Sequence, residues 1–249
     1  MATKKSQRIG IWVIAIAMLV GTIGGFLVMV LAPQNQAADQ ARMDKLSAEY
    51  QAELEEYQAK VEQRDKKMID ELSPKYFDDF KSYKSRVGSF KTDGIDELKK
   101  NDLKAGSGAS ISDDTKFAVF YMGWNGEGKM FDSSFNDDES GLGAPLIHEG
   151  NGVWTFPGGQ QGGVIDGWNE GVKGMKIGGV RELTIPSDMA YGSSGQGEDI
   201  KPDSPLKFVM MAVPAPDTGE EVERPKMSEE YKKLYSRLNN IDPSFLEGM

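Results

Sequence analysis

Three segments of the chain differ in how their apolar and polar residues are arranged. Residues 9–31 are rich in apolar side chains and carry no charge, whereas residues 37–72 place apolar side chains three or four positions apart. Between residues 117 and 213, short runs repeat apolar side chains at every second position. These periods predict a membrane-spanning helix, then a long amphipathic helix, then a β-rich domain.

The uncharged segment 9–31 is long enough to cross a hydrocarbon core of about 30 Å. Lys4, Lys5 and Arg8 precede it, whereas residues 32–40 contain no Lys or Arg. The positive-inside rule therefore places residues 1–8 in the cytoplasm and the rest of the chain outside. A cleaved signal peptide is the alternative, but its apolar core is usually only about 7 to 15 residues long. We expect a single-pass anchor in the cell membrane.

Residues 37–86 are expected to form a helical stalk. The part before residue 73 lacks Gly and Pro and is rich in strong helix formers. Its apolar stripe consists of Met43, Leu46, Tyr50, Leu54, Tyr57, Val61, Met68 and Leu72. Arg64 interrupts this stripe, so both a homodimeric coiled coil and a solvated spacer helix remain open. Pro74 is expected to end the helix, and the aromatic side chains of 74–86 to pack on the stalk or on the next domain.

Residues 87–214 read as one β-rich domain. Residues 87–91 fit a first strand, and KFAVFYMGWNGEGKMFDSSF fits two strands around a Gly-rich turn. A short helix over 166–177 is stopped by Gly178 and Gly179, and a strand over 180–185 ends at Pro186. In the last strand, one face should carry Leu206, Phe208, Met210 and Ala212.

Residues 215–249 follow this domain as an acidic linker and a short helix. The apolar face of that helix consists of Tyr231, Leu234, Leu238 and Ile241. Such a face is expected to dock on another part of the chain or on a partner.

Composition removes several classes of function. The 249 residues carry a net charge of −10 with both signs intermixed, which argues against nucleic-acid binding. The absence of Cys excludes disulfides, thiolate nucleophiles and Cys-ligated zinc. The glycines of FPGGQQGGV match no nucleotide-binding motif, so we expect no cofactor.

Residues 136–153 contain two features that could suggest a metal site or a catalytic residue, but neither matches a known pattern. The acidic run Asp137, Asp138 and Glu139 lacks the spaced ligands of an EF-hand loop, so no metal is expected. His148 has no nucleophile motif near it, which favours a loop residue over a catalyst.

Three separated segments resemble the FKBP-type peptidyl-prolyl cis-trans isomerases. They are VFYMGWNGEGKMFDSSF, VIDGWNEGVKGMKIGG and LTIPSDMAYG, they occur in the family's order, and the resemblance extends over about residues 96–213. It implies an α+β fold in which a curved antiparallel sheet wraps on a short helix. It also implies isomerase (rotamase) activity, which, together with the predicted membrane anchor, predicts an enzyme that assists the folding of extracytoplasmic proteins. The implied partners are proline-containing polypeptides and macrolide inhibitors of the FKBP class.

The resemblance also implies a site. It assigns catalysis to Tyr121, Phe131, Asp132, Tyr191 and Phe208. It assigns substrate binding to Trp154, Val164, Ile165, Trp168 and Ile200. Trp168 would be the pocket floor, and the Ile165 N–H and the Tyr191 hydroxyl would bind substrate carbonyls. Because rotation about an X-Pro bond breaks no covalent bond, such a pocket needs no nucleophile or metal.

Two departures from the family stand out. Residues 136–153 lengthen a connection and leave open whether they cover the pocket. The loop after Tyr191 lacks the frequent His-Pro pair and has Gln196, Gly197 and Glu198 instead, which weakens the expected grip on substrate. Two other functions stay open: a non-catalytic, membrane-tethered chaperone module dimerised by its stalk, and recruitment of a partner by the acidic loop and C-terminal helix.

Overall fold

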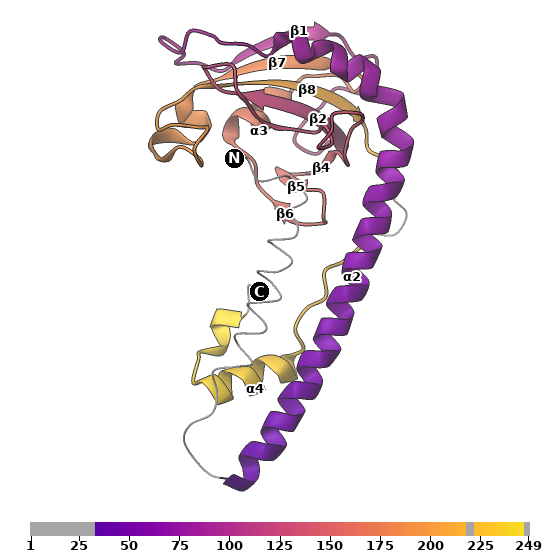
Figure 1. Ribbon diagram of the computed structural model, residues 1–249, viewed down its shortest axis with the longest axis vertical. Helices are drawn as coiled ribbons and strands as arrows, with labels where there is room; N and C mark the ends of the chain where they lie inside the picture. The colour runs from indigo at the N-terminus through magenta and orange to yellow at the C-terminus, as the bar shows by residue number, and fades with distance from the viewer. Residues whose placement is uncertain (1–32, 218–221, 247–249) are drawn as a thin grey trace. The chain divides into compact units, whose positions relative to one another are not determined.

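The computed structural model describes residues 33–217 and 222–246, which belong to two compact units. Of the described residues, 62–217 form the sheet unit, and 33–61 together with 222–246 form the helical unit. Helix α2, Pro33–Ser82, contributes to both (Figure 1). Within the described ranges, no helix is long and apolar enough to cross a membrane. The transmembrane segment predicted over 9–31 and the cytoplasmic residues 1–8 lie outside those ranges.

One antiparallel sheet dominates the sheet unit. Its strand order is β1-β7-β8-β2-β4-β5-β6, with β3 paired to β2. The strands are β1 Lys99–Lys104, β2 Phe117–Trp124, β3 Met130–Ser133, β4 Leu146–Gly150, β5 Val153–Thr155, β6 Gln161–Gly162, β7 Val180–Ile185 and β8 Leu206–Pro214. Short helical elements are α3 Asp166–Val172, η1 Tyr83–Arg86, η2 Ser187–Met189 and η3 Gly192–Ser194. The predicted combination of an antiparallel sheet with a short helix is confirmed, but α3 ends at Val172, five residues before the end predicted at residue 177.

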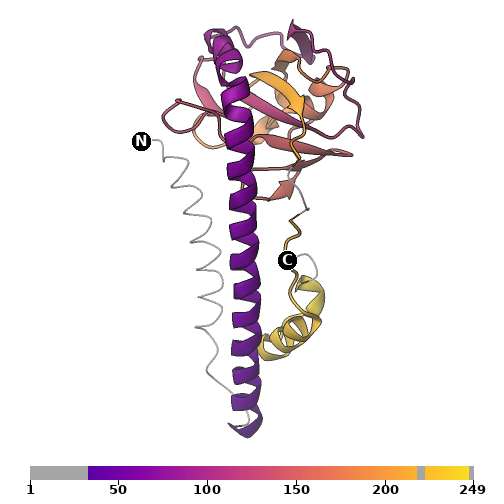
Figure 2. The ribbon, with the colours of Figure 1, turned by 90° about the vertical axis from the view of Figure 1, so that its right-hand side faces the viewer.

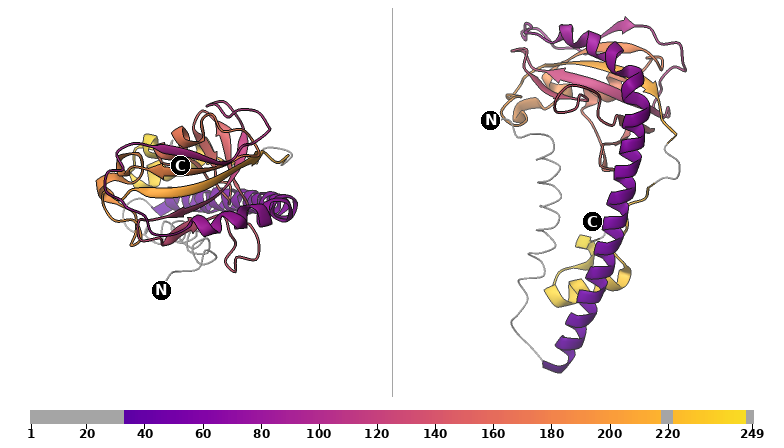
Figure 3. Two further views of the ribbon diagram at one scale, coloured as in Figure 1. Left: turned by 90° about the horizontal axis from the view of Figure 1, so that it is seen from above. Right: turned by 45° about the vertical axis from the view of Figure 1, so that its right-hand side comes forward.

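Both faces of the sheet are buried. On one face, alternate residues of β8 join the cluster that contains Trp168 and Val172 of α3, and they are Leu206, Phe208, Met210 and Ala212, as predicted. The intervening residues Val209, Met211 and Val213 join a second cluster with Leu72 and Phe80 of α2. Figures 2 and 3 show the C-terminal part of α2 against the sheet. The central strands therefore read as almost continuous apolar runs.

Helix α2 does not end at Pro74, so that prediction was wrong. The helix runs through Pro74 to Ser82. A proline inside a helix costs about 3 kcal/mol because it lacks an N–H and crowds the preceding turn. Burial offsets this cost, since Leu72 and Phe80 on either side of the proline are 3% and 0% exposed. The ring of Phe80 lies 6.3 Å from that of Phe120 and 5.4 Å from that of Phe135.

The first strand also differs from the prediction. Residues 87–91 form no strand, and the Phe90 N–H donates instead to the Gly126 carbonyl at 3.1 Å. Within the described part of the chain, the first strand is β1, and its one partner strand there is β7. Most of its side chains are exposed. Because β1 is a polar edge strand, it carries no apolar alternation that a sequence pattern could reveal.

In the helical unit, α4 (Glu229–Asn239) docks on α2, and η4 (Pro243–Leu246) follows it. The Tyr231 ring lies 6.0 Å from that of Tyr50, and Leu234 is buried. Arg237 pairs with Asp39 at 2.7 Å. The apolar face of the C-terminal helix thus finds its partner on the stalk. Tyr50, one residue of the stripe considered for a stalk dimer, is in contact with α4.

Two carboxylates on β1 and β7 should make the sheet unit sensitive to acid. Burial alone raises the pKa of Glu182, but hydrogen bonds from Arg86 and Lys207 outweigh it and leave the pKa below its usual value of 4.5. A hydrogen bond from Arg181 lowers the pKa of Asp102 below 3.8. Both carboxylates have a lower pKa in the folded state than in the unfolded state. Each therefore contributes its full stabilisation of the fold at pH values above its unfolded-state pKa, and this contribution is lost as the pH falls through its folded-state pKa.

We therefore expect the free energy of unfolding to fall steeply below about pH 4.5. Urea unfolding followed by circular dichroism at several pH values from neutral to acid measures this slope. Glu182→Gln should flatten it, with Glu198→Gln on the exposed flap as the matched control. An equal slope in the wild type and Glu182→Gln would show that this carboxylate does not carry the effect.

Candidate active site

A pocket of about 490 Å³ lies on the face of the sheet that α3 covers. It brings together eight of the ten predicted site residues. Its lining consists of Tyr121, Phe131, Asp132, Leu146, Phe156, Gly163, Val164, Ile165, Asp166, Trp168, Ala190, Tyr191 and Phe208. Most of these side chains are apolar or aromatic, as expected for a site that takes up a small apolar group.

Trp168 lies at the centre of the aromatic side chains of the pocket. Its ring centroid is 4.8 Å from Tyr121 and 5.2 Å from Phe208, both in edge-to-face geometry. Only 5% of Trp168 is exposed. Edge-to-face pairs at these distances are favourable and hold each ring in one orientation. The floor is therefore rigid before any ligand arrives.

Two glycines explain how α3 brings Trp168 so close to the sheet. A Cβ on Gly167 would lie 2.3 Å from Ile185, and one on Gly171 would lie 2.4 Å from Leu183. Only a residue without a side chain fits at these positions. The helix therefore lies directly on β7, with Trp168 next to the first of these glycines.

Tyr121 and Asp132 form the polar wall. The Tyr121 hydroxyl donates to Asp132 Oδ2 at 2.6 Å, and the Ser133 N–H donates to Oδ1 at 2.9 Å. Burial raises the pKa of Tyr121 well above its usual value, and the charge of Asp132 raises it further. Tyr121 thus remains a neutral hydrogen-bond donor at any physiological pH. Its bond fixes the carboxylate at the edge of the pocket.

Two partly exposed donors of the lining have no hydrogen-bond partner within the described residues. Within the described residues, the Tyr191 hydroxyl and the Ile165 N–H donate no hydrogen bond. The Nε1 of Trp168 has no partner among the residues described either, but it is fully buried and therefore not accessible to a ligand. Burial raises the pKa of Tyr191, with a further contribution from Asp132, so its hydroxyl stays protonated. The Tyr191 hydroxyl and the Ile165 N–H are partly buried and lie in one pocket, so they suit a ligand with carbonyl oxygens.

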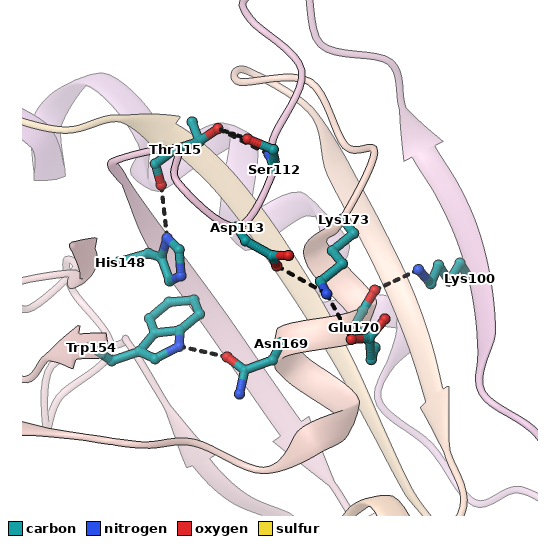
Figure 4. Close-up of polar contacts among 9 residues, drawn as sticks. All are labelled: Lys100, Ser112, Asp113, Thr115, His148, Trp154, Asn169, Glu170 and Lys173. Carbon is teal, nitrogen blue, oxygen red and sulfur yellow. Dashed lines mark hydrogen bonds and ion pairs between the residues drawn. The ribbon is translucent and has the colours of Figure 1, made fainter. Parts of the chain in front are cut away.

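Trp154 supports the floor and does not line the pocket. It is fully buried, lies 5.9 Å from the Trp168 ring, and donates from Nε1 to Asn169 Oδ1 at 2.9 Å (Figure 4). The neighbouring wall position belongs to Phe156, two residues later. Alternation from Trp154 along β5 could have suggested Phe156, but the strand ends at Thr155.

Ile200 also lies outside the lining. It is 4% exposed, and its backbone pairs with that of Gln196 in both directions. This bridge closes the flap after Tyr191. Although the flap lacks the His-Pro pair, Asn125 Nδ2 ties it to the β2–β3 turn through the Asp199 carbonyl at 2.8 Å.

Residues 136–153 do not form a plain loop, and their acidic turn does not cover the pocket. The Leu142 N–H donates to Ser73 Oγ of α2 at 2.8 Å, and Glu139 pairs with Lys84. Leu142 belongs to the cluster on the α2 face of the sheet. From this segment only Leu146, on β4, reaches the pocket. No sequence signal pointed to that role.

His148 lies in strand β4 and not in a loop, so that prediction was wrong. It is 4% exposed, and its Nδ1 is 2.7 Å from the Thr115 carbonyl oxygen (Figure 4). Its ring packs against those of Phe117 and Trp154, at centroid distances of 5.1 and 4.9 Å. Its place behind Trp154 gives it a packing role.

Gly123 on β2 tests how tightly the aromatic wall is packed. A Cβ at this position would lie 2.3 Å from Phe208 Cε1 and 3.0 Å from Phe131 Cζ. Gly123→Ala must therefore displace Phe208. We expect kcat/KM for a proline peptide to fall about tenfold, equivalent to about 1.4 kcal/mol of transition-state binding. Gly88→Ala is the control, because nothing lies within 4 Å of its added Cβ. Equal activity of the two folded variants would contradict this packing.

Comparisons with known proteins identify the unit that contains the pocket. A sequence model of the family described as FKBP-type peptidyl-prolyl cis-trans isomerase matches residues 108–211. The "FK506-binding protein" of Neisseria meningitidis serogroup B is 42% identical over 107 residues, which cover 43% of this chain and 85% of that protein. "FK506-binding protein 4" of Dictyostelium discoideum is 42% identical over 111 residues, covering 45% of this chain and 26% of that protein.

A crystal structure of a peptidyl-prolyl cis-trans isomerase from Pseudomonas syringae pv. tomato is also similar. Its sequence identity is 25%, its TM-score is 0.35, and the match covers 55% of this chain and 90% of that one. The residues that the family model matches include every residue of the pocket lining. The chain belongs to the FKBP-type peptidyl-prolyl cis-trans isomerase family.

Proposed function

We propose that the pocket above Trp168 catalyses rotation about X-Pro bonds in polypeptides that fold outside the cytoplasm. The observation that carries the proposal is the combination of a buried aromatic floor with two donors in one pocket, the Tyr191 hydroxyl and the Ile165 N–H, that make no hydrogen bond within the described residues. An apolar surface of this size suits a prolyl ring, and the donors suit the carbonyl oxygens on either side of it.

The mechanism follows from the physics of the amide bond. A planar amide is stabilised by resonance that separates charge, and the twisted amide lacks it. A dry aromatic pocket disfavours the charge-separated planar form more than the twisted one. In our proposal, the prolyl ring lies on Trp168 between Tyr121 and Phe208, where water is excluded. Groups that bind the twisted form selectively accelerate rotation about tenfold for every 1.4 kcal/mol.

The donors would hold the substrate backbone while the bond rotates. We assign the Tyr191 hydroxyl and the Ile165 N–H to substrate carbonyls on the two sides of the rotating bond. Asp132 would add a local negative field and hold Tyr121 in place. Val164 and Phe131 would complete the apolar walls. No group of the chain has to exchange a proton with the substrate in this scheme.

The same pocket would bind macrolide inhibitors of the FKBP class. Two of the similar proteins are named for binding FK506, and a macrolide with a prolyl-like ring and flanking carbonyls matches the same donors. Titration with FK506 should change the Trp fluorescence and inhibit isomerisation with the same midpoint. Inhibition without a fluorescence change, or the reverse, would contradict binding at Trp168.

Placement outside the cytoplasm rests on the sequence. Lys4, Lys5 and Arg8 precede the uncharged segment 9–31. An epitope added after Met249 should be degraded when protease is applied to intact cells stripped of any outer layer. An epitope that is protected until the membrane is dissolved would place the isomerase on the other side.

A refolding assay tests the biological role. Folding limited by a prolyl bond takes tens to hundreds of seconds at 25 °C. The full-length chain in detergent should shorten such a phase in a reduced, unfolded substrate protein at a small molar ratio. A phase that keeps its rate, although peptide isomerisation is accelerated, would contradict a role in protein folding.

A further inference from the structure

The charged residues of the pocket lining are all acidic. Asp132 and Asp166 are its only ionisable groups besides tyrosines. The Asp132 carboxylate is occupied by the Tyr121 hydroxyl and the Ser133 N–H. Asp166 is exposed, and within the described residues its carboxylate takes part in no hydrogen bond or ion pair. Besides the hydrogen-bonded Asp132, the pocket lining therefore presents to an incoming peptide the charge of Asp166, which no cation among the described residues pairs with.

The nearby cations of the flap and of the β2–β3 turn do not neutralise this charge. Lys129 pairs with Asp199, and Lys201 pairs with Glu127 at 2.5 Å. Glu198 adds a further carboxylate to the same flap. The surroundings of the pocket mouth thus contain no unpaired cation on the flap that would attract an acidic substrate.

The position of Asp166 places its charge beside the bound peptide. It directly follows Ile165, whose uncommitted N–H also lines the pocket. Adjacent Cα atoms are about 3.8 Å apart. A side chain one residue from the proline is therefore within reach of the carboxylate when Ile165 holds the substrate backbone.

We propose that Asp166 is a specificity-determining residue that makes the enzyme favour proline flanked by Lys or Arg. This inference rests on the proposed function, because it requires the substrate to occupy the Trp168 pocket. Asp166 is exposed, so the attraction is screened and each charge contributes modestly. We expect about threefold faster turnover of a Lys-containing peptide than of its Leu analogue, and about threefold slower turnover of the Glu analogue.

The test uses the full-length chain in detergent and two-dimensional exchange NMR. Blocked Ala-Xaa-Pro-Phe peptides with Lys, Leu or Glu at Xaa probe the residue before proline, and Ala-Leu-Pro-Lys and Ala-Leu-Pro-Glu probe the residue after it. For the wild type we expect a Lys-to-Glu ratio of kcat/KM of about ten in at least one series. Asp166→Asn should reduce that ratio to about two, and Asp166→Lys should invert it. Raising the salt concentration should reduce the wild-type ratio.

Asp78→Asn is the matched control. It removes the same charge from an exposed position on α2, on the opposite face of the sheet, and should leave the wild-type ratio unchanged. If the Leu peptide is accelerated but the Lys-to-Glu ratio is the same in the wild type and Asp166→Asn, this inference is overturned. If the folded wild type does not accelerate even the Leu peptide, the proposed function fails instead.

Discussion

Asp132→Val is expected to lower kcat/KM for a proline tetrapeptide at least about tenfold, with the chain still folded. The change removes the carboxylate that accepts the 2.6 Å hydrogen bond from Tyr121, so the buried Tyr121 hydroxyl loses this acceptor. Hydrogen bonds to charged groups contribute about 1.5 to 3 kcal/mol, which corresponds to about tenfold or more in rate if the pocket geometry is lost. Exchange NMR with circular dichroism on the same sample measures both properties.

Two variants separate the charge of Asp132 from its shape. Asp132→Asn retains the volume and one acceptor oxygen, so its activity should lie between that of the wild type and Asp132→Val. Tyr121→Phe removes the other partner, and the double variant should lose less than the sum of the two single losses. If Asp132→Val folds and retains wild-type kcat/KM, the polar wall has no catalytic role.

Arg181→Met is expected to reduce the free energy of unfolding by about 3 kcal/mol. The Arg181 side chain is 7% exposed and donates to both carboxylate oxygens of Asp102, at 2.6 and 3.2 Å. It also donates to the carbonyls of Gly171 and Lys173 at the end of α3, at 2.8 and 2.9 Å. Met fills similar space but leaves two carbonyls without this donor. The Asp102 side chain is 57% exposed, so water can hydrate its carboxylate once Arg181 is removed. The loss in free energy of unfolding should therefore lie near the lower end of the range seen when a buried ion pair is broken.

Urea unfolding of Arg181→Met measures this loss. Lys201→Met is the comparison, because the ion pair of Lys201 with Glu127 is about 70% exposed on both sides and should contribute under about 1 kcal/mol. Because Arg181 anchors the helix that carries Trp168, Arg181→Met should also lose activity at urea concentrations below its own unfolding midpoint. A loss equal to that of Lys201→Met would contradict the anchoring role of Arg181.

The sequence predicted those site residues whose positions are fixed by local motifs. Tyr121 and Asp132 lie on a hairpin with a clear turn, and Val164, Ile165 and Trp168 lie at the start of a short helix. It could not distinguish Trp154 from Phe156 as the wall. Phe156 lies one residue beyond the end of β5, where strand alternation no longer fixes the direction of a side chain.

The outer layer of the fold was harder to predict because it depends on tertiary packing. Pro74 is a strong local stop signal, yet burial of Leu72 and Phe80 against the sheet carries the helix past it. Strand β4 was hidden because its residues follow an acidic, Gly-rich stretch. In both cases, contacts that are distant in sequence outweigh the local preference.

The most direct test of the central claim is the rate of cis–trans exchange in blocked Ala-Leu-Pro-Phe. It should be measured with the folded full-length chain and with Tyr191→Phe, whose hydroxyl makes no hydrogen bond within the described residues. We predict that the wild type accelerates exchange and that Tyr191→Phe, equally folded, loses about three- to tenfold, as expected for one neutral hydrogen bond. A folded wild type that leaves exchange at its uncatalysed rate would contradict the account and favour a non-catalytic binding module.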